Sequence, residues 1–378
     1  MDGKTAIWFL PDNIALTGDK TPLMLQTVQF CPILSWTCAE LTAMGVGRLF
    51  IVCDKSVHEQ LRPCVPWDAV LVDGARHAEE LLEHLSGKTG DVIVLNGVVL
   101  PVGVFSGGAV YSATIPAVRR VLKEHGAFAA FPEGAEILRG FLPVGDEEEL
   151  RAAQPMCRQK ILQKLLDGGV EIMDTNNCYV DPRVKVGAGT VLLPGTILRG
   201  ETVIGEGCTI GPNTMLTDCT VGDCTEVNAS QATESRIGSH TNVGPFAYLR
   251  PNSTVGDHVK VGDFVEIKNS VVGNGTKISH LTYVGDSDVG ERVNFGCGTV
   301  TTNYDGFRKY RCTIGDDVFI GCNTNLVAPV TLGDGCYTAA GSTITKDVPK
   351  DALGVARERQ VNLDGWAAKN REIKGQKK

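Results

Sequence analysis

Residues 237–267 read IGSHTNVGPFAYLRPNSTVGDHVKVGDFVEI, and an aliphatic residue returns at every sixth position of this stretch. The aliphatic positions are Ile237, Val243, Leu249, Val255, Val261 and Ile267, and glycine follows four of them. A period of six fits neither an α-helix nor an ordinary strand, but it is typical of hexapeptide repeats. Three such units make one triangular coil, with the aliphatic side chain inward and the small residue permitting the corner. The stretch therefore predicts a left-handed parallel β-helix.

The same sixfold spacing continues on both sides of this stretch. One coil cannot bury its own inner face, so the repeat is stable only as a stack of coils. The upstream inward positions are Val186, Leu192, Leu198, Ile204, Ile210 and Leu216, and the downstream ones are Ile314, Ile320, Leu326, Leu332, Thr338 and Ile344. We therefore expect the β-helix to occupy residues 171–348, followed by a C-terminal tail over residues 349–378.

The composition separates the repeat region from the rest of the chain. A chain of 378 residues is long enough for about two domains, and its four Trp all lie outside residues 171–348, where wide rings would not fit a narrow core. A net charge of −8, without a basic stripe before the tail, argues against a nucleic-acid partner. No long apolar run or secretory leader is apparent, so we expect a cytoplasmic protein without membrane insertion.

The 13 cysteines raise the questions of disulfides and of metal binding. No C-x₂-C pair is present, and many of the cysteines stand at repeat positions where Ser, Thr or Ala would serve, which favours free thiols in a reducing compartment. The γ-class carbonic anhydrases use the same β-helix, but their zinc site needs two histidines five residues apart. The repeat offers only His240, His258 and His280, so we expect no metal site.

Residues 1–145 have the pattern of an α/β domain, in which short apolar runs suited to buried parallel strands alternate with helical periodicity. The predicted strands are Thr5–Leu10, Arg48–Cys53 and Asp91–Asn96, and the predicted helices are Gln26–Met44, Ala75–Ser86 and Thr114–Glu124. A nucleotide site in such a domain needs a Gly-rich turn after the first strand. The segment Leu10–Gly18 contains one glycine, so we expect no phosphate cradle there.

Residues 146–170 are expected to form a helical linker. Asp146 is a candidate N-cap, and Glu149 follows at the spacing of a capping box. Pro155 is expected to start a second helix or to kink the first. Gly168 and Gly169 are expected to end the helix.

Two basic residues occupy equivalent repeat positions. Arg250 and Lys268 are eighteen residues apart, and each follows an inward aliphatic residue, so they should stack on successive coils about 4.8 Å apart. Two cations this close repel each other unless an anion lies between them or both splay into solvent. The spacing thus indicates either a phosphate site or two solvated surface cations.

The coil after Ile267 is one residue shorter, which aligns His280 with Asp263 on one side and Cys297 on the other. A histidine oriented by a carboxylate can act as a general base, although a lone outward histidine is commonly a surface residue. The many polar residues near His280 favour the functional interpretation. After Thr301 a long polar segment interrupts the repeat, and we predict a projecting loop that carries Lys309.

Six strings of sequence carry a family resemblance. They are NVGPFAYLRP from Asn242, VGDFVEIKNS from Val261, SHLTYVGD from Ser279, TNYDG from Thr302, IGDDVFIG from Ile314 and LVAPVTLG from Leu326. Over residues 242–366 the chain closely resembles the acetyltransferase domain of the bacterial bifunctional N-acetylglucosamine-1-phosphate uridyltransferase/glucosamine-1-phosphate N-acetyltransferase family. The resemblance implies transfer of acetyl from acetyl-CoA to the amine of glucosamine 1-phosphate, for UDP-N-acetylglucosamine and cell-wall precursor synthesis. It also implies a homotrimer whose sites lie between subunits.

The resemblance assigns roles to individual residues. His280 falls on the family's general base. The sugar phosphate is held at Arg250, Lys268, Tyr283 and Asn294, and the acetyl-CoA side comprises Cys297, Asn303, Tyr304, Cys322, Ala340 and, in the tail, Arg357. Lys309 matches a basic loop residue near the acceptor or the CoA phosphates. The family usually has Ser at position 322 and Ala at position 297. Because a thiol is a weaker donor than a hydroxyl, oxyanion stabilisation is expected to be weaker or to rest on Asn303.

Residues 1–145 resemble the family's uridyltransferase domain only as a shortened and degenerate form. The Gly-rich loop of the family is missing, and Val98 stands where the GDxPL motif has its magnesium-binding Asp. We therefore expect a truncated, nucleotidyltransferase-like remnant without uridyltransferase activity.

Two other hypotheses stay open. In the first, the acetyl acceptor is another amino-sugar phosphate or nucleotide. In the second, the trimer is a non-catalytic scaffold with a regulatory N-terminal domain. A scaffold has no need of His280, Asn303, Tyr304 or Arg357. Replacement of His280 by Ala separates a scaffold, which would be unaffected, from an acetyltransferase, which would lose turnover.

Overall fold

The computed structural model describes residues 4–10, 21–103, 108–126 and 131–375. The chain separates into two compact units, residues 1–239 and 240–378, and each is presented by itself. The boundary between the units falls inside the repeat region. The domain limits expected from the sequence, after residues 145, 170 and 348, stay predictions.

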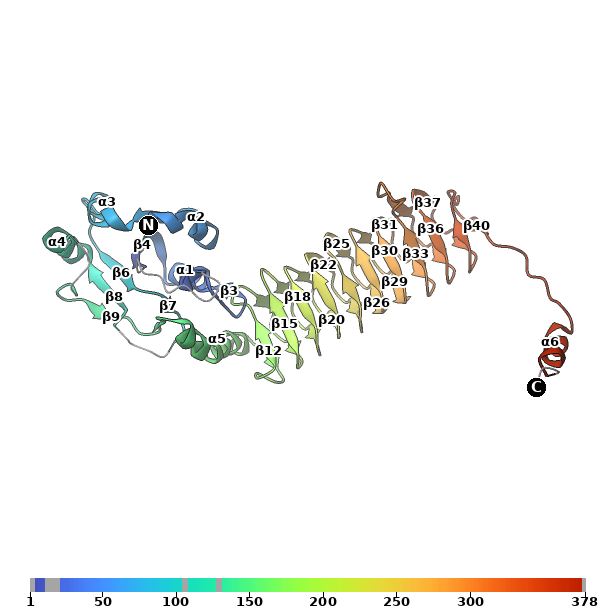
Figure 1. Ribbon diagram of the computed structural model, residues 1–378, viewed down its shortest axis with the longest axis horizontal. Coiled ribbons are helices and arrows are strands. Elements are labelled where there is room, and N and C mark those ends of the chain that lie inside the picture. The colour runs from blue at the N-terminus through green and yellow to red at the C-terminus, as the bar shows by residue number, and fades with distance from the viewer. Residues whose placement is uncertain (1–3, 11–20, 104–107, 127–130, 376–378) are drawn as a thin grey trace. The chain divides into compact units, whose positions relative to one another are not determined.

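The first unit begins with an α/β domain built on a six-stranded sheet in the order β5-β4-β1-β6-β8-β9 (Figure 1). The strands are β1 (Lys4–Phe9), β4 (Val46–Cys53), β5 (Val70–Asp73), β6 (Asp91–Asn96), β8 (Val110–Thr114) and β9 (Glu136–Ile137). Strands β5, β4, β1 and β6 are parallel, which confirms the predicted parallel core. Strands β8 and β9 form an antiparallel edge that was not predicted. The residues described between β6 and β8 contain no crossover helix, which a parallel neighbour would need.

Three longer helices belong to this domain: α1 (Ile33–Ala43), α3 (His77–His84) and α4 (Ile115–His125). The first begins later than the predicted Gln26, because β2 (Thr27–Val28) and β3 (Cys31–Pro32) form an antiparallel hairpin there. Pro32 keeps the residue before it extended and thereby excludes it from a helix. Shorter elements are η1 (Leu23–Leu25), η2 (Lys55–Val57), α2 (His58–Leu61), η3 (Arg62–Cys64), η4 (Gly74–Arg76), β7 (Val99–Leu100) and β10 (Leu142–Pro143).

Helix α5 (Glu147–Asp167) follows the α/β domain. The Asp146 side chain accepts a hydrogen bond from the Glu149 N–H at 2.8 Å, which confirms the predicted N-cap. The Glu149 carboxylate accepts from the N–H of Gly145, one residue earlier than a standard capping box requires. The helix is continuous through Pro155, so the alternative of a second helix is wrong. Gly168 caps its C-terminus as predicted.

The first unit ends in coils of parallel strands, arranged as three faces. The first face has β11 (Glu171–Ile172), β14 (Val191–Leu192), β17 (Thr209–Ile210) and β20 (Glu226–Val227). The second has β12 (Cys178–Val180), β15 (Thr196–Arg199), β18 (Met215–Thr217) and β21 (Gln231–Thr233). The third has β13 (Lys185–Val186), β16 (Val203–Ile204), β19 (Thr220–Val221) and β22 (Ser235–Ile237).

The second unit has the same three-faced construction. Its first face has β23 (Asn242–Val243), β26 (Lys260–Asp263), β29 (Lys277–His280), β32 (Asn294–Phe295), β35 (Phe319–Ile320), β38 (Tyr337–Thr338) and β40 (Leu353–Gly354). Its second face has β24 (Tyr248–Leu249), β27 (Glu266–Lys268), β30 (Tyr283–Gly285), β33 (Val300–Thr302), β36 (Asn325–Val327) and β39 (Thr343–Ile344). Its third face has β25 (Ser253–Val255), β28 (Val271–Val272), β31 (Ser287–Val289), β34 (Cys312–Ile314) and β37 (Val330–Leu332).

The predicted inward positions form the core of both sets of coils. Every one of them is buried except Val186, which is half-buried in an early coil. Val261 pairs with Ile278, seventeen residues later, which confirms the shortened coil. These observations confirm the hexapeptide-repeat β-helix that the period of six predicted.

The glycines after the inward residues have a different role from the one expected. A Cβ on Gly262 would lie 2.0 Å from the Ser279 carbonyl oxygen of the next coil, and one on Gly256 would lie 2.4 Å from the Asn274 side chain. Neither glycine has a positive φ, whereas the corner residues Phe246 and Phe264 do, at 59° and 54°. At these positions glycine is needed for the close approach of coils and not for the left-handed turn.

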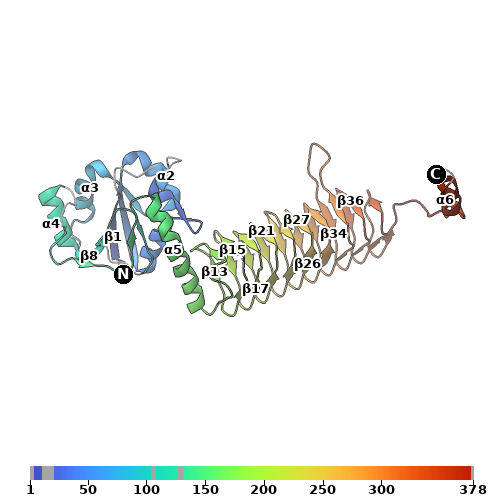
Figure 2. The same cartoon turned by 60° about the horizontal axis from the view of Figure 1, so that its bottom comes forward.

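The predicted loop leaves the stack between β33 and β34 and is drawn in orange in Figure 2. It is a small hairpin: Tyr304 bridges Lys309, and the Tyr310 N–H donates to the Asn303 carbonyl at 2.9 Å. The Asp305 side chain accepts from two further backbone N–H groups of the loop, both at 2.7 Å. These bonds give the loop a defined conformation.

After β40 the chain leads to helix α6 (Trp366–Gly375), which has no buried residue. Within the part of the chain that the structure describes, no helix combines the length and the apolar character needed to cross a bilayer.

Candidate functional site

His280 ends strand β29 and lies directly opposite Asp263, the last residue of β26. Its Nδ1 atom is 2.5 Å from Asp263 Oδ1, so the stacking predicted from the seventeen-residue coil is confirmed. The carboxylate fixes the orientation of the ring, and with Nδ1–H as the donor the neutral ring leaves Nε2 free to accept a proton. The imidazole is 56% exposed, so a substrate can reach it.

The hydrogen bond between His280 and Asp263 also changes the pKa of the carboxylate. The hydrogen bond from His280 lowers the pKa of Asp263 below its usual range. An aspartate with a lowered pKa contributes stability above its unfolded-state pKa, and this contribution is lost as the pH falls through the lowered value. Asp263 therefore stays ionised, and keeps His280 oriented, throughout the neutral range.

The predicted stack of cations is confirmed on the second face. Leu249 pairs with Ile267, so Arg250 and Lys268, each one residue further on, lie side by side. Arg250 Nη1 is 2.7 Å from Glu266 Oε1. Lys268 contacts Lys309 of the loop, and this second ammonium, together with a smaller contribution from desolvation, lowers the pKa of Lys268. Three cations thus gather near two carboxylates, Glu266 and Asp286, which leaves the group with excess positive charge.

Tyr283 completes this cluster of cations. It begins strand β30, three residues after His280, and its ring lies flat over Gly285, where an added Cβ would be only 2.4 Å from the phenol oxygen. Gly285 in turn lies opposite Lys268. The tyrosine hydroxyl is therefore directed along the second face toward the cations, and it contributes to the electrostatic environment of Arg250. We refer to Arg250, Lys268, Tyr283 and Lys309 as the cationic cluster.

Gly285→Ala should therefore disturb the cationic cluster without removing a charged group. The new methyl group would displace the Tyr283 ring, and the KM for an acceptor bound through the Tyr283 hydroxyl should rise by about fivefold, the value of one hydrogen bond. Steady-state kinetics would measure this change. Gly375→Ala, at a position with open space around it, is the control. A KM in Gly285→Ala equal to that of the control would contradict the placement of Tyr283.

A column of residues continues from His280 along the corner after the first face. Phe295 pairs with Ile320 and Ile320 with Thr338, so Cys297, Cys322 and Ala340 lie opposite one another on successive coils. The N–H groups of Asn323 and Gly341 donate to the carbonyls of Cys297 and Cys322, both at 2.8 Å. In the tail, the side chain of Arg357 lies close to Gly341. Three of the six residues predicted for the acetyl-CoA side, Cys297, Cys322 and Ala340, are thus consecutive members of one column.

Asn303 and Tyr304 lie at the base of the loop. Asn303 is buried, and one of its amide N–H groups donates to the carboxylate of Asp286. The amide of Asn269 donates to the same carboxylate at 2.5 Å. Tyr304 is exposed, and its hydroxyl donates to the Gly306 carbonyl within the loop. Asp286 therefore fixes Asn303, while Tyr304 is held by the loop itself.

Asn294 is separated from the other predicted acceptor residues. It lies on the first face, between Lys277 and Phe319, whereas the cationic cluster is on the second face. His280 and Tyr283 stand on either side of the corner that joins these two faces. The predicted site is thus spread over two faces, and Asn294 approaches it from the side of His280.

Two residues of the site escaped sequence reasoning, Glu266 and Asp286. Glu266 binds Arg250, and Asp286 is a carboxylate with only 4% of its surface exposed. A signal was present, because Asn269, Asp286 and Asn303 are spaced by seventeen residues, the length of the shortened coil. The same arithmetic that aligned His280 with Asp263 would have aligned these three residues.

The loss of a nucleotide site from the α/β domain stays a prediction. Val98, which stands in place of the family's metal-binding Asp, is an apolar residue buried in the core. The Gly97 carbonyl, one residue earlier, accepts a hydrogen bond from the indole of Trp8 at 2.7 Å. Most of the segment Leu10–Gly18, in which we expect no phosphate cradle, lies outside the described residues.

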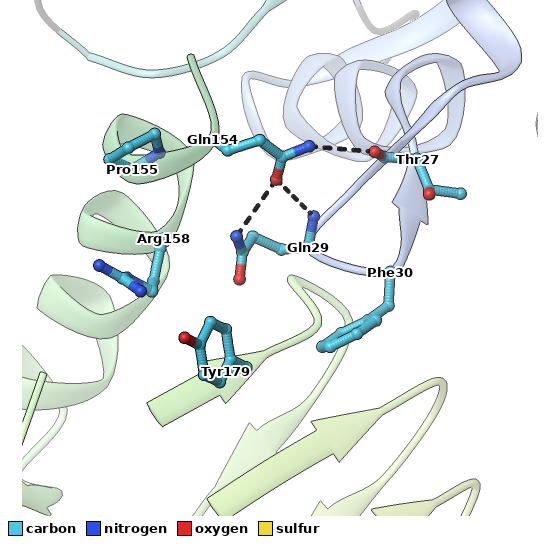
Figure 3. Close-up of a pocket in the computed structure, with 7 residues that line it drawn as sticks. All are labelled: Thr27, Gln29, Phe30, Gln154, Pro155, Arg158 and Tyr179. Atoms are coloured by element: carbon cyan, nitrogen blue, oxygen red, sulfur yellow. Dashed lines mark hydrogen bonds between the residues drawn. The ribbon is translucent and has the colours of Figure 1, made fainter. Parts of the chain in front are cut away.

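A hollow of about 400 Å³ in the first unit is shown in Figure 3. Gln154 of α5 lies at its edge, and its amide donates to the Thr27 carbonyl and accepts from Gln29. Arg158 stacks over Tyr179 on the opposite side. These contacts attach the β2–β3 hairpin to α5, and we assign the hollow a structural role.

Comparison with known proteins agrees with the hexapeptide repeat. The family described as "Bacterial transferase hexapeptide (six repeats)" matches residues 183–218, 234–269 and 311–346. The chain thus carries hexapeptide repeats of the kind that this family model describes. More specifically, it is a homologue of the proteins named "Bifunctional protein GlmU".

Two of these relatives illustrate the extent of the match. The protein from Geobacillus sp. (strain WCH70) is 47% identical over 249 residues, which cover 66% of this chain and 54% of the relative. The protein from Clostridium perfringens (strain SM101 / Type A) is 51% identical over 230 residues, which cover 61% of this chain and 51% of the relative. The chain thus spans about half the length of the curated relatives it matches.

Among solved structures, an Arabidopsis UDP-N-acetylglucosamine acyltransferase is 20% identical. The alignment covers 55% of this chain and 74% of that one, with a TM-score of 0.29.

Proposed function

We propose that this protein transfers the acetyl group of acetyl-CoA to the amine of an amino-sugar phosphate, with glucosamine 1-phosphate as the acceptor. The observation that carries the proposal is the cationic cluster beside the oriented His280. Lys268 and Lys309 contact each other although both are cations, and an anion between them would relieve the repulsion. The identity of 47% over 249 residues and of 51% over 230 residues to two GlmU proteins supports the same conclusion.

In this proposal His280 acts as the general base. Asp263 holds its Nδ1, so Nε2 takes the proton from the acceptor ammonium or from the attacking amine. The amine nitrogen then bonds to the thioester carbonyl carbon, and the CoA thiolate leaves. Asp263 also stabilises the imidazolium that forms.

The cationic cluster positions the acceptor. Arg250, Lys268 and Lys309 hold the phosphate, and the Tyr283 hydroxyl donates to it or to the sugar. Such placement brings the amine within reach of His280 and lowers the entropy cost of the reaction. The column of Cys297, Cys322 and Ala340, with Asn303, Tyr304 and Arg357, supplies the acetyl-CoA side.

We further propose that the protein acts as a homotrimer. Phe246, Phe264 and Leu281 occupy the same corner on successive coils, and each is more than half exposed. Phe246 and Phe264 stack on each other with 5.4 Å between ring centroids. A ladder of exposed apolar side chains next to His280 is suited to contact with a second copy of the chain. A site assembled between copies would also accommodate acceptor residues that lie on two faces.

The test is release of CoA thiol from acetyl-CoA by the purified protein, with glucosamine 1-phosphate compared against glucosamine. Release that depends on the phosphate supports both the reaction and the acceptor class. Equal release with another amino-sugar phosphate or nucleotide would favour that acceptor instead. No release with any amino sugar, from a folded trimer, would favour the scaffold.

The same preparation should show no uridyltransferase activity. With Val98 in place of the family's metal-binding Asp, the domain lacks the carboxylate that would hold magnesium beside the phosphates. The measurement is formation of UDP-N-acetylglucosamine from UTP, magnesium and N-acetylglucosamine 1-phosphate. Detectable, protein-dependent product would contradict the proposal that this activity is lost.

A further inference from the structure

Cys297 and Cys322 occupy neighbouring places in the column that begins at His280. The Asn323 N–H donates to the Cys297 carbonyl at 2.8 Å, just as the Leu281 N–H donates to the Asp263 carbonyl at 2.9 Å. The second of these pairings brings the side chains of Asp263 and His280 to 2.5 Å. By the same backbone relation, Cys297 and Cys322 occupy stacked positions on neighbouring coils.

The coils approach each other closely at this place. Gly296 precedes Cys297, and a Cβ on it would lie 2.4 Å from the backbone nitrogen of Cys322. Residues opposite each other on neighbouring parallel strands have Cα atoms about 4.8 Å apart. A disulfide requires a Cα separation of about 4.4–6.8 Å. The stacked positions of Cys297 and Cys322 therefore meet the Cα separation that a disulfide requires.

These two cysteines also differ from most others in accessibility. Cys322 is exposed and Cys297 half-buried, and both are free thiols. Nine of the thirteen cysteines are buried, and burial raises the pKa of Cys219 and of Cys312 to about 11, which suppresses their reactive thiolates. The remaining two are Cys64, which is half-buried, and Cys224, which is exposed and lies over Gly207.

We propose that Cys297 and Cys322 form a paired-thiol site that closes reversibly to a disulfide when a peroxide oxidises it. One thiolate attacks the peroxide oxygen and becomes a sulfenic acid, with release of one water. The second thiol attacks the sulfenic sulfur, and the S–S bond forms with release of another water. The two thiols together lose two electrons and two protons, and the peroxide is reduced. A small thiol reductant reverses the change by exchange.

The consequence for activity rests on the proposed function. Both cysteines fall on the acetyl-CoA side of the site, where the family usually has Ala and Ser. A disulfide there would remove the thiol hydrogen of Cys322 and fill the space beside the thioester. Oxidation should therefore stop acetyl transfer, and bound acetyl-CoA should shield the thiols from oxidation.

Peptide mapping of the full-length protein tests the pairing directly. Reduced protein is treated with hydrogen peroxide, alkylated and digested with trypsin, and mass spectrometry is used to look for residues 293–308 joined to residues 312–346 through Cys297 and Cys322. The joined peptide should appear, and dithiothreitol should abolish it. Acetyl-CoA at ten times its dissociation constant should slow its formation by about tenfold.

Three variants make the test specific. Cys297→Ser and Cys322→Ser keep the side-chain size and should each prevent the joined peptide, whereas Cys224→Ser should leave it unchanged. Separate oxidation of the two cysteines to sulfinic acids, without the joined peptide, would overturn the proposal. The pairing and the proposed function can fail independently. A joined peptide in a protein without acetyl transfer would support the pairing and overturn the proposed function. Acetyl transfer without a joined peptide would support the proposed function and overturn the pairing.

Discussion

Replacement of His280 by alanine should lower kcat for acetyl transfer by roughly 10²–10⁴, the usual contribution of a general base. The KM for either substrate should change little, because the phosphate is held by the cationic cluster and acetyl-CoA by the column beyond His280. The His280 side chain is exposed, and the carboxylate to which it is hydrogen-bonded is half-buried. The variant should therefore fold normally, as circular dichroism and the trimer mass would show.

His258→Ala is the matched control for this variant. His258 is also an exposed histidine at a corner of the repeat, where it stacks on His240 with 5.0 Å between ring centroids. Its replacement should leave kcat within the error of the measurement. If His280→Ala and His258→Ala were equally active, His280 would not be the base, and the surface-residue interpretation would be correct.

Asp263→Asn examines the orientation of the base. The amide keeps the size of the side chain but loses the charge that stabilises an imidazolium, so kcat should fall by less than in His280→Ala. Because the pKa of Asp263 is lowered by His280, the wild-type carboxylate is lost only in acid, below the usual aspartate range. Steady-state kcat of Asp263→Asn and of His280→Ala at neutral pH, where the wild-type carboxylate is ionised, measures this difference.

The repeat explains how much of the structure could be predicted from sequence. Each coil has a fixed length, so a sequence distance of seventeen or eighteen residues becomes a spatial contact. This is why the sequence alone predicts the stacking of His280 on Asp263 and of Arg250 on Lys268. Stacked residues of a β-helix are always one coil length apart in the sequence. The inward aliphatic residues mark where each coil begins and therefore which residues stack.

Other features depend on contacts that no period encodes. The hairpin at Thr27–Pro32 replaced the start of a predicted helix, and the antiparallel edge of the first sheet depends on how the chain returns from β6. The contact between Lys268 and Lys309 is made by a loop that interrupts the repeat, so its position follows from hydrogen bonds at Asp305 and Tyr310. Helical propensity and coil length carry no information about such contacts.

Replacement of Lys268 by alanine should reduce kcat/KM for glucosamine 1-phosphate by about 10- to 150-fold, the range for a lost hydrogen bond to a charged group. Activity with unphosphorylated glucosamine should change much less, because Lys268 is proposed to bind the phosphate and not the sugar. Preference for the phosphorylated acceptor should thus fall in the variant. Comparison of kcat/KM for the two acceptors, at one ionic strength, measures this preference.

Lys277→Ala is the control for the charge itself. Lys277 also stacks on a lysine of the neighbouring coil, Lys260, but on the first face and without a loop cation beside it. If general surface charge caused the loss of activity, Lys268→Ala and Lys277→Ala would lose activity equally. The activity with glucosamine would then fall to the same extent. If the cationic cluster is a phosphate site, only Lys268→Ala loses the preference. In addition, glucosamine 1-phosphate should raise the Tm of the wild type and of Lys277→Ala more than that of Lys268→Ala.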